Sequence, residues 1–387
     1  MAFLGWLRWG LYAVLAAVVI GGVFALDLTA LVVLVAIAAA FGALGWRWPE
    51  LATPLTMIVV GAAFLLGFMI WAYADQASGF ELAISNPLPG TFAIATPLIL
   101  GALAGCLCER AGVINVAIEG QFLVGAFFAS VAASLAYSAT TGLLGGIVGG
   151  VGLGALLALF SIRYLVNQVV LGVVLVVLAS GLTAFLLDQI PGNPAIRQYL
   201  NEPPVLESLA IPVLSELPVI GDAMFNQTIL VYLMYLSVVV VAFVMFETRW
   251  GLRVRAVGEH PTAADTVGIK VRRMRWQAVL LAGVFAGLGG AYYTVGSTGS
   301  FDKGASSGNG FIALAAVIMG RWHPIWATFA ALFFGLMSSL QDQLKLLTTI
   351  PGELLTMTPY IAAVIAVAGF VGRVRPPAAD GEPYVKS

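Results

Sequence analysis

Polar side chains are rare within the long apolar runs of this 387-residue chain, and their positions indicate where chemistry could occur. Asn115, Glu119 and Gln121 lie within seven residues of one another, and Asn309 opens a later, shorter run. A polar group inside an apolar helix either lines a path for a solute or ion or hydrogen-bonds to a neighbouring helix. We expect Asn115 and Glu119 to share one helical face. The four residues are therefore candidates for lining or gating a path, with hydrogen bonding between helices as the alternative.

Residue sets typical of enzymes do not occur in the sequence. The two histidines, His260 and His323, are far apart, and the apolar runs hold no Ser/His/Asp set, metal-ligand cluster or carboxylate pair. Cys106 and Cys108 are separated by one residue, which fits neither a disulfide framework nor a zinc site. No phosphate-binding G-x-x-x-x-G-K-S/T segment is present. We therefore expect no catalytic residue, no bound metal and no cofactor in this chain.

One basic segment, residues 248–275, reads TRWGLRVRAVGEHPTAADTVGIKVRRMR and has seven basic residues against two acidic ones. Pro261 suits the first turn of a helix, where its missing N–H costs no hydrogen bond. Residues 262–267 could continue for about two turns, and Gly268 can adopt the left-handed conformation that ends a helix. The pattern predicts a short amphipathic helix with basic flanks. Such a helix could dock into a groove on a cytosolic partner or contact lipid headgroups.

Long apolar helices must position these residues. Hydrophobic residues make up 60% of the chain and charged residues 10%, with a mean hydropathy of +0.99, whereas a soluble protein has about 25% charged residues. A helix needs about 20 apolar residues to cross a bilayer. We predict an all-α polytopic integral membrane protein with ten to twelve segments, including a short or re-entrant one at 308–320. The other segments are 9–26, 28–46, 53–73, 87–108, 113–137, 142–162, 166–187, 227–247, 276–297, 325–343 and 354–372.

The basic residues fix the orientation of these segments. With twelve segments and the N-terminus inside, 15 of the 18 basic residues face the cytoplasm, which is the bias that sets membrane topology. Only Arg197, Lys303 and Lys345 then face outward. This assignment requires segment 308–320 to cross the membrane. Both termini are predicted to be cytoplasmic. The net charge of −1 gives no field that would attract nucleic acid.

Segment boundaries divide the chain into three parts. Residues 1–86 are predicted as an N-terminal extension of three helices, and 373–387 as a disordered tail. The membrane domain, 87–372, has an outer loop at 188–226 and the basic cytoplasmic loop at 248–275. Small residues spaced four apart let helix backbones approach closely in lipid, so we expect one set of glycines to mediate helix packing. These are Gly142, Gly146, Gly150 and Gly154, followed later by Gly283 and Gly287.

Three ordered motifs resemble permease subunits of bacterial ABC importers in the ribose, nucleoside and branched-chain amino acid group. Residues 251–269, GLRVRAVGEHPTAADTVGI, are similar to the coupling segment of that group. Residues 109–121, ERAGVINVAIEGQ, resemble the E-R-x-G-V-x-N-x-x-x-E-G pattern of the nucleoside (guanosine-type) branch, and residues 310–324, GFIALAAVIMGRWHP, match the same branch. The resemblance covers roughly residues 87–372, and the three N-terminal helices exceed what shorter members have.

The resemblance implies a multi-pass subunit of the bacterial inner membrane in an importer for nucleosides. Its partners would be a second, different permease, cytosolic ATPase subunits that bind ATP and Mg²⁺, and an extracytoplasmic solute-binding protein. The chain itself would not hydrolyse ATP. A branched-chain amino acid or sugar permease remains an alternative, as does an ion-coupled secondary transporter. Residues that match the coupling segment are Gly258, Glu259, His260, Pro261, Ala263, Ala264, Asp265 and Gly268.

Overall fold

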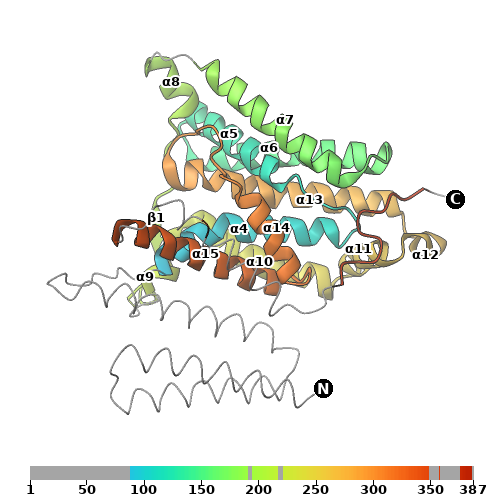
Figure 1. Ribbon diagram of the computed structural model, residues 1–387. Helices are drawn as coiled ribbons and strands as arrows, with labels where there is room; N and C mark the ends of the chain where they lie inside the picture. Colours follow the sequence, from blue (N-terminus) through green and yellow to red (C-terminus); the bar gives the residue numbers. More distant parts are fainter. Residues whose placement is uncertain (1–87, 191–193, 217–220, 348–356, 358–374, 386–387) are drawn as a thin grey trace, which may run out of the picture. The chain divides into compact units, whose positions relative to one another are not determined.

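The computed structural model describes residues 88–190, 194–216, 221–347, 357 and 375–385 (Figure 1). Residues Leu88–Leu336 and the described C-terminal residues form one compact unit, to which the following description applies. The predicted segments 9–26, 28–46, 53–73 and 354–372, and with them the N-terminal extension 1–86, lie outside the described residues, Met357 aside.

Seven helices of the described part are long and apolar enough to cross a membrane. They are α4 (Leu88–Glu109), α5 (Ile118–Ala136), α6 (Ala139–Ala158), α7 (Gln168–Asp188), α10 (Ile229–Glu247), α13 (Val271–Tyr292) and α15 (Pro324–Leu347). Two of them end in π-helical turns, η2 (Leu159–Arg163) after α6 and η3 (Thr294–Thr298) after α13. The predicted short segment 308–320 corresponds to α14 (Asn309–Met319), which has 11 residues. The protein is thus mainly helical, and the total of about twelve segments is not confirmed.

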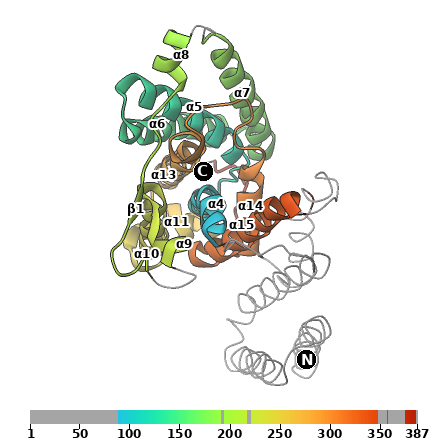
Figure 2. The same cartoon turned by 90° about the vertical axis from the view of Figure 1, so that its left-hand side faces the viewer.

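Helix α13 lies at the centre of the unit. It packs against α4, α5 and α6, with α5, α6 and α7 on one side of it and α4, α10 and α14 on the other (Figures 1 and 2). Most residues of α4 and α5 are buried, whereas most residues of α7 and α10 are exposed or half-buried. The exposed residues of α7 and α10 include many valines, leucines and phenylalanines. Those two helices therefore present surfaces suited to lipid or to another membrane subunit.

Glycines bring the backbones of α6 and α13 into direct contact. A Cβ placed on Gly150 would overlap the carbonyl oxygen of Gly283, and one placed on Gly283 would lie 2.8 Å from the carbonyl oxygen of Gly150. Gly146 and Gly287 face each other in the same way. Of the remaining predicted packing glycines, Gly142 lies against α5 and η3 and Gly154 lies near Gln121 and α13. Even an alanine side chain does not fit between α6 and α13 at Gly150.

The described residues of the predicted outer loop, 188–226, are folded. They contain α8 (Pro194–Asn201), strand β1 (Ser208–Ala210) and α9 (Gly221–Phe225), and β1 pairs antiparallel with β2 (Asn226–Thr228). Asn201 ties the loop to the segment after η3, because its Oδ1 accepts from Phe301 N at 2.8 Å and its Nδ2 donates to Phe301 O at 3.0 Å. Leu206 N also donates to Val295 O at 2.8 Å. These residues are therefore attached to the chain that follows the C-terminal end of α13.

The C-terminal tail differs from its prediction. In place of the disorder expected over 373–387, residues 375–385 follow a defined path in which Pro377, Ala379 and Tyr384 are buried. Ala379 N donates to Gly258 O at 2.9 Å. Composition led to the error, because the tail is polar and short and gains its contacts only from residues more than 100 positions earlier in the chain.

Candidate functional site

The basic loop forms two helices where the sequence predicts one. Helix α11 (Arg249–Glu259) precedes α12 (Pro261–Thr266). The helical conformation is interrupted between them at His260, which has φ −142° and ψ 83°. Gly268 ends the pair with the expected left-handed conformation, at φ +88°. The sequence carried a signal for α11 that was missed. Its buried residues are Gly251, Val254 and the adjacent pair Val257 and Gly258, which is the i, i+3, i+6/i+7 spacing of one helical face.

Two glycines attach α11 to its neighbours. Gly251 lies directly on the carbonyl groups of Val244 and Met245 at the end of α10, and Gly258 lies on the carbonyl group of Arg110. Thr248 caps the helix through a hydrogen bond from Gly251 N to its Oγ1 at 3.1 Å. Neither glycine has room for a Cβ, so α11 is held at both of its ends.

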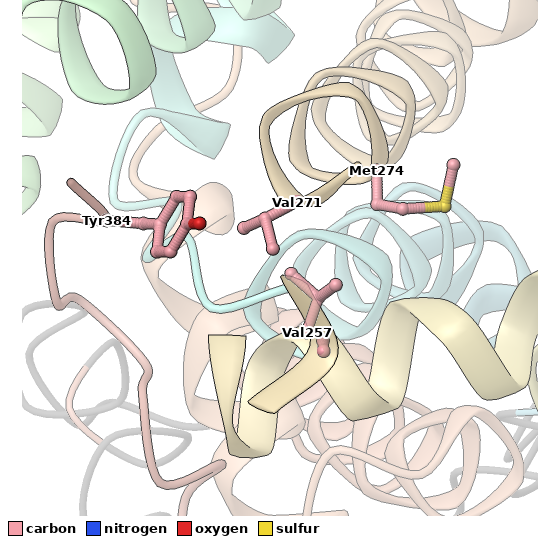
Figure 3. Packing of buried hydrophobic residues seen from close by; sticks show 5 residues of the cluster. Val257, Val271, Met274 and Tyr384 are labelled. Atoms are coloured by element: carbon pink, nitrogen blue, oxygen red, sulfur yellow. The ribbon is translucent and has the colours of Figure 1, made fainter. Parts of the chain in front are cut away.

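One side of α12 packs inward and the other faces solvent. Ala264 belongs to a buried cluster with Val257, Val271, Met274 and Tyr384, which we call the loop cluster (Figure 3). The opposite face is exposed and includes Thr262, Ala263 and Thr266, and beyond the helix Val267 is 76% exposed. Of the other coupling candidates, Gly258 is buried, Pro261 and Asp265 are half-buried, and Glu259, His260 and Gly268 are exposed.

The three motifs of the sequence converge at this end of the unit. The Arg110 side chain donates from Nε to Trp322 O at 2.9 Å and from Nη2 to Arg321 O at 3.2 Å. Trp322 Nε1 donates in turn to the buried carboxylate of Glu109. Because Gly258 also rests on the Arg110 carbonyl, segments 109–121, 251–269 and 310–324 form one connected cluster.

Titratable groups are enclosed in this cluster. Burial, with the nearby charge of Glu109, raises the pKa of Asp380 to about 8, while Arg275 opposes the shift. Burial, with the charge of Arg110, lowers the pKa of His323, whose ring stacks on Phe246 at a centroid distance of 4.4 Å. His323 is therefore a neutral packing residue at neutral pH.

Glu119 binds the start of the short helix α14. Its Oε1 accepts from Ser306 Oγ at 2.6 Å and Gly308 N at 2.8 Å, and its Oε2 accepts from Gly310 N at 2.7 Å. A carboxylate at a helix N-terminus is stabilised by the helix dipole. The structure thus brings Glu119 next to Asn309, which begins α14. The sequence did not single out Ser306 or Gly310, although the Gly308-Asn309-Gly310 run before an apolar segment marks a helix start.

Asn115 is not on the same helical face as Glu119, which corrects the prediction. Residues 110–117 form a loop that turns at Gly112, with φ +81°, and α5 starts only at Ile118. From this loop Asn115 Nδ2 donates to Gln121 Oε1 at 3.1 Å, and both side chains are fully buried. These hydrogen bonds within the protein favour the structural interpretation of Asn115, Glu119 and Gln121 over a lining of a path.

Comparison with known proteins gives consistent matches. The family model described as "Branched-chain amino acid transport system / permease component" matches residues 88–371. The guanosine ABC transporter permease protein NupQ of Bacillus subtilis is 39% identical over 78% of this chain and 97% of its own length. The nucleoside ABC transporter permease protein NupC of Lactococcus lactis is 39% identical over 76% and 94%.

A second guanosine ABC transporter permease protein of Bacillus subtilis, NupP, is 25% identical over 84% of this chain and 96% of its own length. No solved structure matches the chain.

Proposed function

The chain belongs to the branched-chain amino acid transport system / permease component family, and we propose that it is one of two non-identical permeases of an ATP-driven nucleoside importer in the bacterial inner membrane. It is a permease subunit of an ABC importer. The observation that carries the cargo assignment is the 39% identity to NupQ and NupC over nearly their whole lengths. Both relatives are named for guanosine or nucleosides.

Two permeases of one bacterium support the pairing with a different subunit. NupQ and NupP share the guanosine name and the organism, yet they are 39% and 25% identical to this chain. A chain that resembles one of two such permeases much more than the other fits one half of a heteromeric pair. The exposed apolar faces of α7 and α10 are the surfaces available for such contact.

The exposed face of α12 supports docking of a cytosolic ATPase, which would bind ATP and Mg²⁺. Force from such a partner has to reach the membrane helices through a firmly attached element. Here α11 is seated on α10 and on the loop after α4, and α12 runs on through Gly268 into α13. The distribution of basic residues supports a cytoplasmic position for this end, with both termini inside. The outer loop at the other end of α13 would meet a solute-binding protein.

An ion-coupled transporter would need an ionisable group free to exchange ions near the bilayer midplane. Glu119, a buried acid in the first turn of α5, has both carboxylate oxygens engaged by donors. That arrangement supports energy input from ATP rather than from an ion gradient.

Competition for uptake tests the cargo. The complete complex, with its ATPase and binding protein, is reconstituted in vesicles loaded with ATP, and uptake of labelled guanosine is measured. We expect unlabelled nucleosides to compete and leucine, ribose and glucose to leave uptake unchanged. A complex that takes up labelled leucine or a labelled sugar but no labelled guanosine would overturn the nucleoside assignment in favour of that cargo.

A further inference from the structure

The C-terminal segment returns to the loop that we assign to ATPase docking. Residues 375–385 lie beside α11 and α12 in Figure 1. Ala379 N donates to the carbonyl oxygen of Gly258 at 2.9 Å, and Ala378 N donates to the carboxylate of Glu259 at 3.2 Å. The segment is thus hydrogen-bonded to the last turn of α11, immediately before the break at His260.

The same segment lies against the loop that follows α4. A Cβ on Gly112 would lie 2.9 Å from the carbonyl oxygen of Ala379. Gly381, at φ +80°, turns the chain beside Ile114. The segment therefore occupies the corner between α11 and residues 110–114, two of the three places where the motifs meet.

Arg275, on the first turns of α13, joins the tail to that corner. It is 2% exposed, and its guanidinium donates from Nε to Ala111 O at 3.1 Å and from Nη1 to Glu382 O at 2.8 Å. A buried guanidinium needs acceptors to offset the loss of water. Without the tail, Arg275 loses the acceptor at Glu382.

Tyr384 closes the loop cluster. It belongs to the same buried cluster as Val257 and Val271, lies beside Val271 in Figure 3 and is 7% exposed. The cluster joins α11 through Val257, α12 through Ala264 and α13 through Val271 and Met274. Since α12 has only six residues, it is too short to be stable as an isolated helix. The tyrosine ring covers the apolar groups that hold α12 to its two neighbours.

We propose that residues 377–384 form a strap that holds α12 in position against α11 and α13, so that motion of the ATPase reaches the membrane helices. Tyr384 and Arg275 are the positioning residues of this strap. The inference rests on the proposed function only in assigning α12 to ATPase contact. The mechanical part, that the tail restrains α12, follows from the contacts of the chain itself.

Hydrogen exchange of the full chain in lipid nanodiscs tests the restraint without any transport measurement. Three variants are compared with the wild type: a chain ending at Arg375, Tyr384→Ala, and Tyr384→Phe as the control that keeps the ring. We expect exchange of amides 260–271 to rise roughly tenfold or more in the first two variants. The buried amides 282–291 of α13 should match the wild type in Tyr384→Ala and Tyr384→Phe. The Phe variant keeps the ring but loses the hydroxyl that interacts with Asp265 of α12, so its amides 260–271 should exchange much less than those of Tyr384→Ala. Unchanged exchange over 260–271, or an equal rise throughout the unit in Tyr384→Ala, would overturn the strap.

A transport measurement distinguishes the role of the tail in coupling from the proposed function of the complex. In the reconstituted complex, Tyr384→Ala should lower solute uptake per ATP hydrolysed severalfold relative to Tyr384→Phe, while the subunits still copurify. If solute uptake per ATP hydrolysed is equal in both variants, the tail is not needed for coupling. If the wild-type complex takes up no nucleoside, the proposed function fails, and the exchange measurement still decides whether the tail restrains α12.

Discussion

At the scale of single residues, Glu119 shows how a buried charge can serve structure. Two backbone amides and a serine hydroxyl donate to its carboxylate, and hydrogen bonds to a charged group are stronger than neutral ones. Gly310 packs directly on the backbone of Glu119. The residue therefore fixes the start of α14 against α5.

Replacing Glu119 should cost stability rather than only transport. We expect Glu119→Ala to lower the free energy of unfolding in detergent by about 3 kcal/mol, because three buried donors lose their acceptor. Glu207→Ala, which removes an exposed acid of the outer loop, is the control and should have little effect. If Glu119→Ala unfolds at the same denaturant concentration as the wild type but takes up no solute, Glu119 would instead belong to the transport path.

The pH dependence of tail attachment depends on Asp380. Its carboxyl faces Glu109 and Cys108 on α4, Arg275 on α13 and the Gly381 amide. The pKa is raised from 3.8 to about 8 when the tail is attached, so the attached state binds the proton more tightly than the detached one. Attachment is therefore strongest at low pH and weakens as the pH rises from about 4 to about 8.

Protection factors of the tail amides, which exclude the intrinsic pH dependence of exchange, measure this effect. Protection of residues 378–382 should be lower at pH 8 than at pH 6 in the wild type. Asp380→Asn keeps the size of the side chain and should remove the difference. Equal protection at both pH values in the wild type would contradict the assignment.

At the scale of helices, the contact between α6 and α13 depends on the missing side chains of glycine. Gly150 has no space for a Cβ, whereas Gly152, two residues further along the same helix, has nothing within 4 Å of that position. Gly150→Ala should destabilise the protein by about 1–3 kcal/mol through overpacking. Gly152→Ala is the matched control and should be neutral or stabilising, since alanine favours helices over glycine. Equal unfolding of the two variants would show that α6 and α13 do not touch here.

Substitutions on the exposed and the buried side of α12 distinguish docking of the ATPase from packing within the permease. Val267 is exposed next to α12, and Ala264 is buried in the loop cluster. We expect Val267→Asp to weaken copurification with the ATPase and to leave thermal unfolding of the permease unchanged. Ala264→Asp should lower the unfolding temperature, because a carboxylate would enter an apolar cluster. The assignment of the docking face fails if Val267→Asp binds the ATPase as the wild type does.

At the scale of the whole molecule, apolar length predicted the helices well and long-range contacts poorly. Every predicted segment between 87 and 343 has a helix in the structure, including the short one at 308–320. Helix α11 was missed because its exposed arginines hide the spacing of its buried residues. Asn115 was placed on a helix because apolar neighbours conceal the turn at Gly112. The polar composition of the tail predicts disorder, because its contacts with Gly258 and Arg275 have no local signal in the sequence.

The site could be predicted only as separate motifs. Each of the segments 109–121, 251–269 and 310–324 was recognisable from its residues, but their meeting at Arg110, Gly258 and Trp322 depends on the packing of α4, α11 and the loop before α15. Neither spacing nor composition encodes that meeting, since residues 122–250 and 270–309 separate the three segments.

Uptake by the reconstituted complex tests the central claim most directly. Vesicles containing this chain, its partner permease and the ATPase are supplied with guanosine-loaded binding protein. We predict that labelled guanosine accumulates when the vesicles contain ATP and that a protonophore does not reduce the accumulation. Replacing ATP by a non-hydrolysable analogue should abolish it. Accumulation that persists with the analogue and collapses with the protonophore would contradict the account.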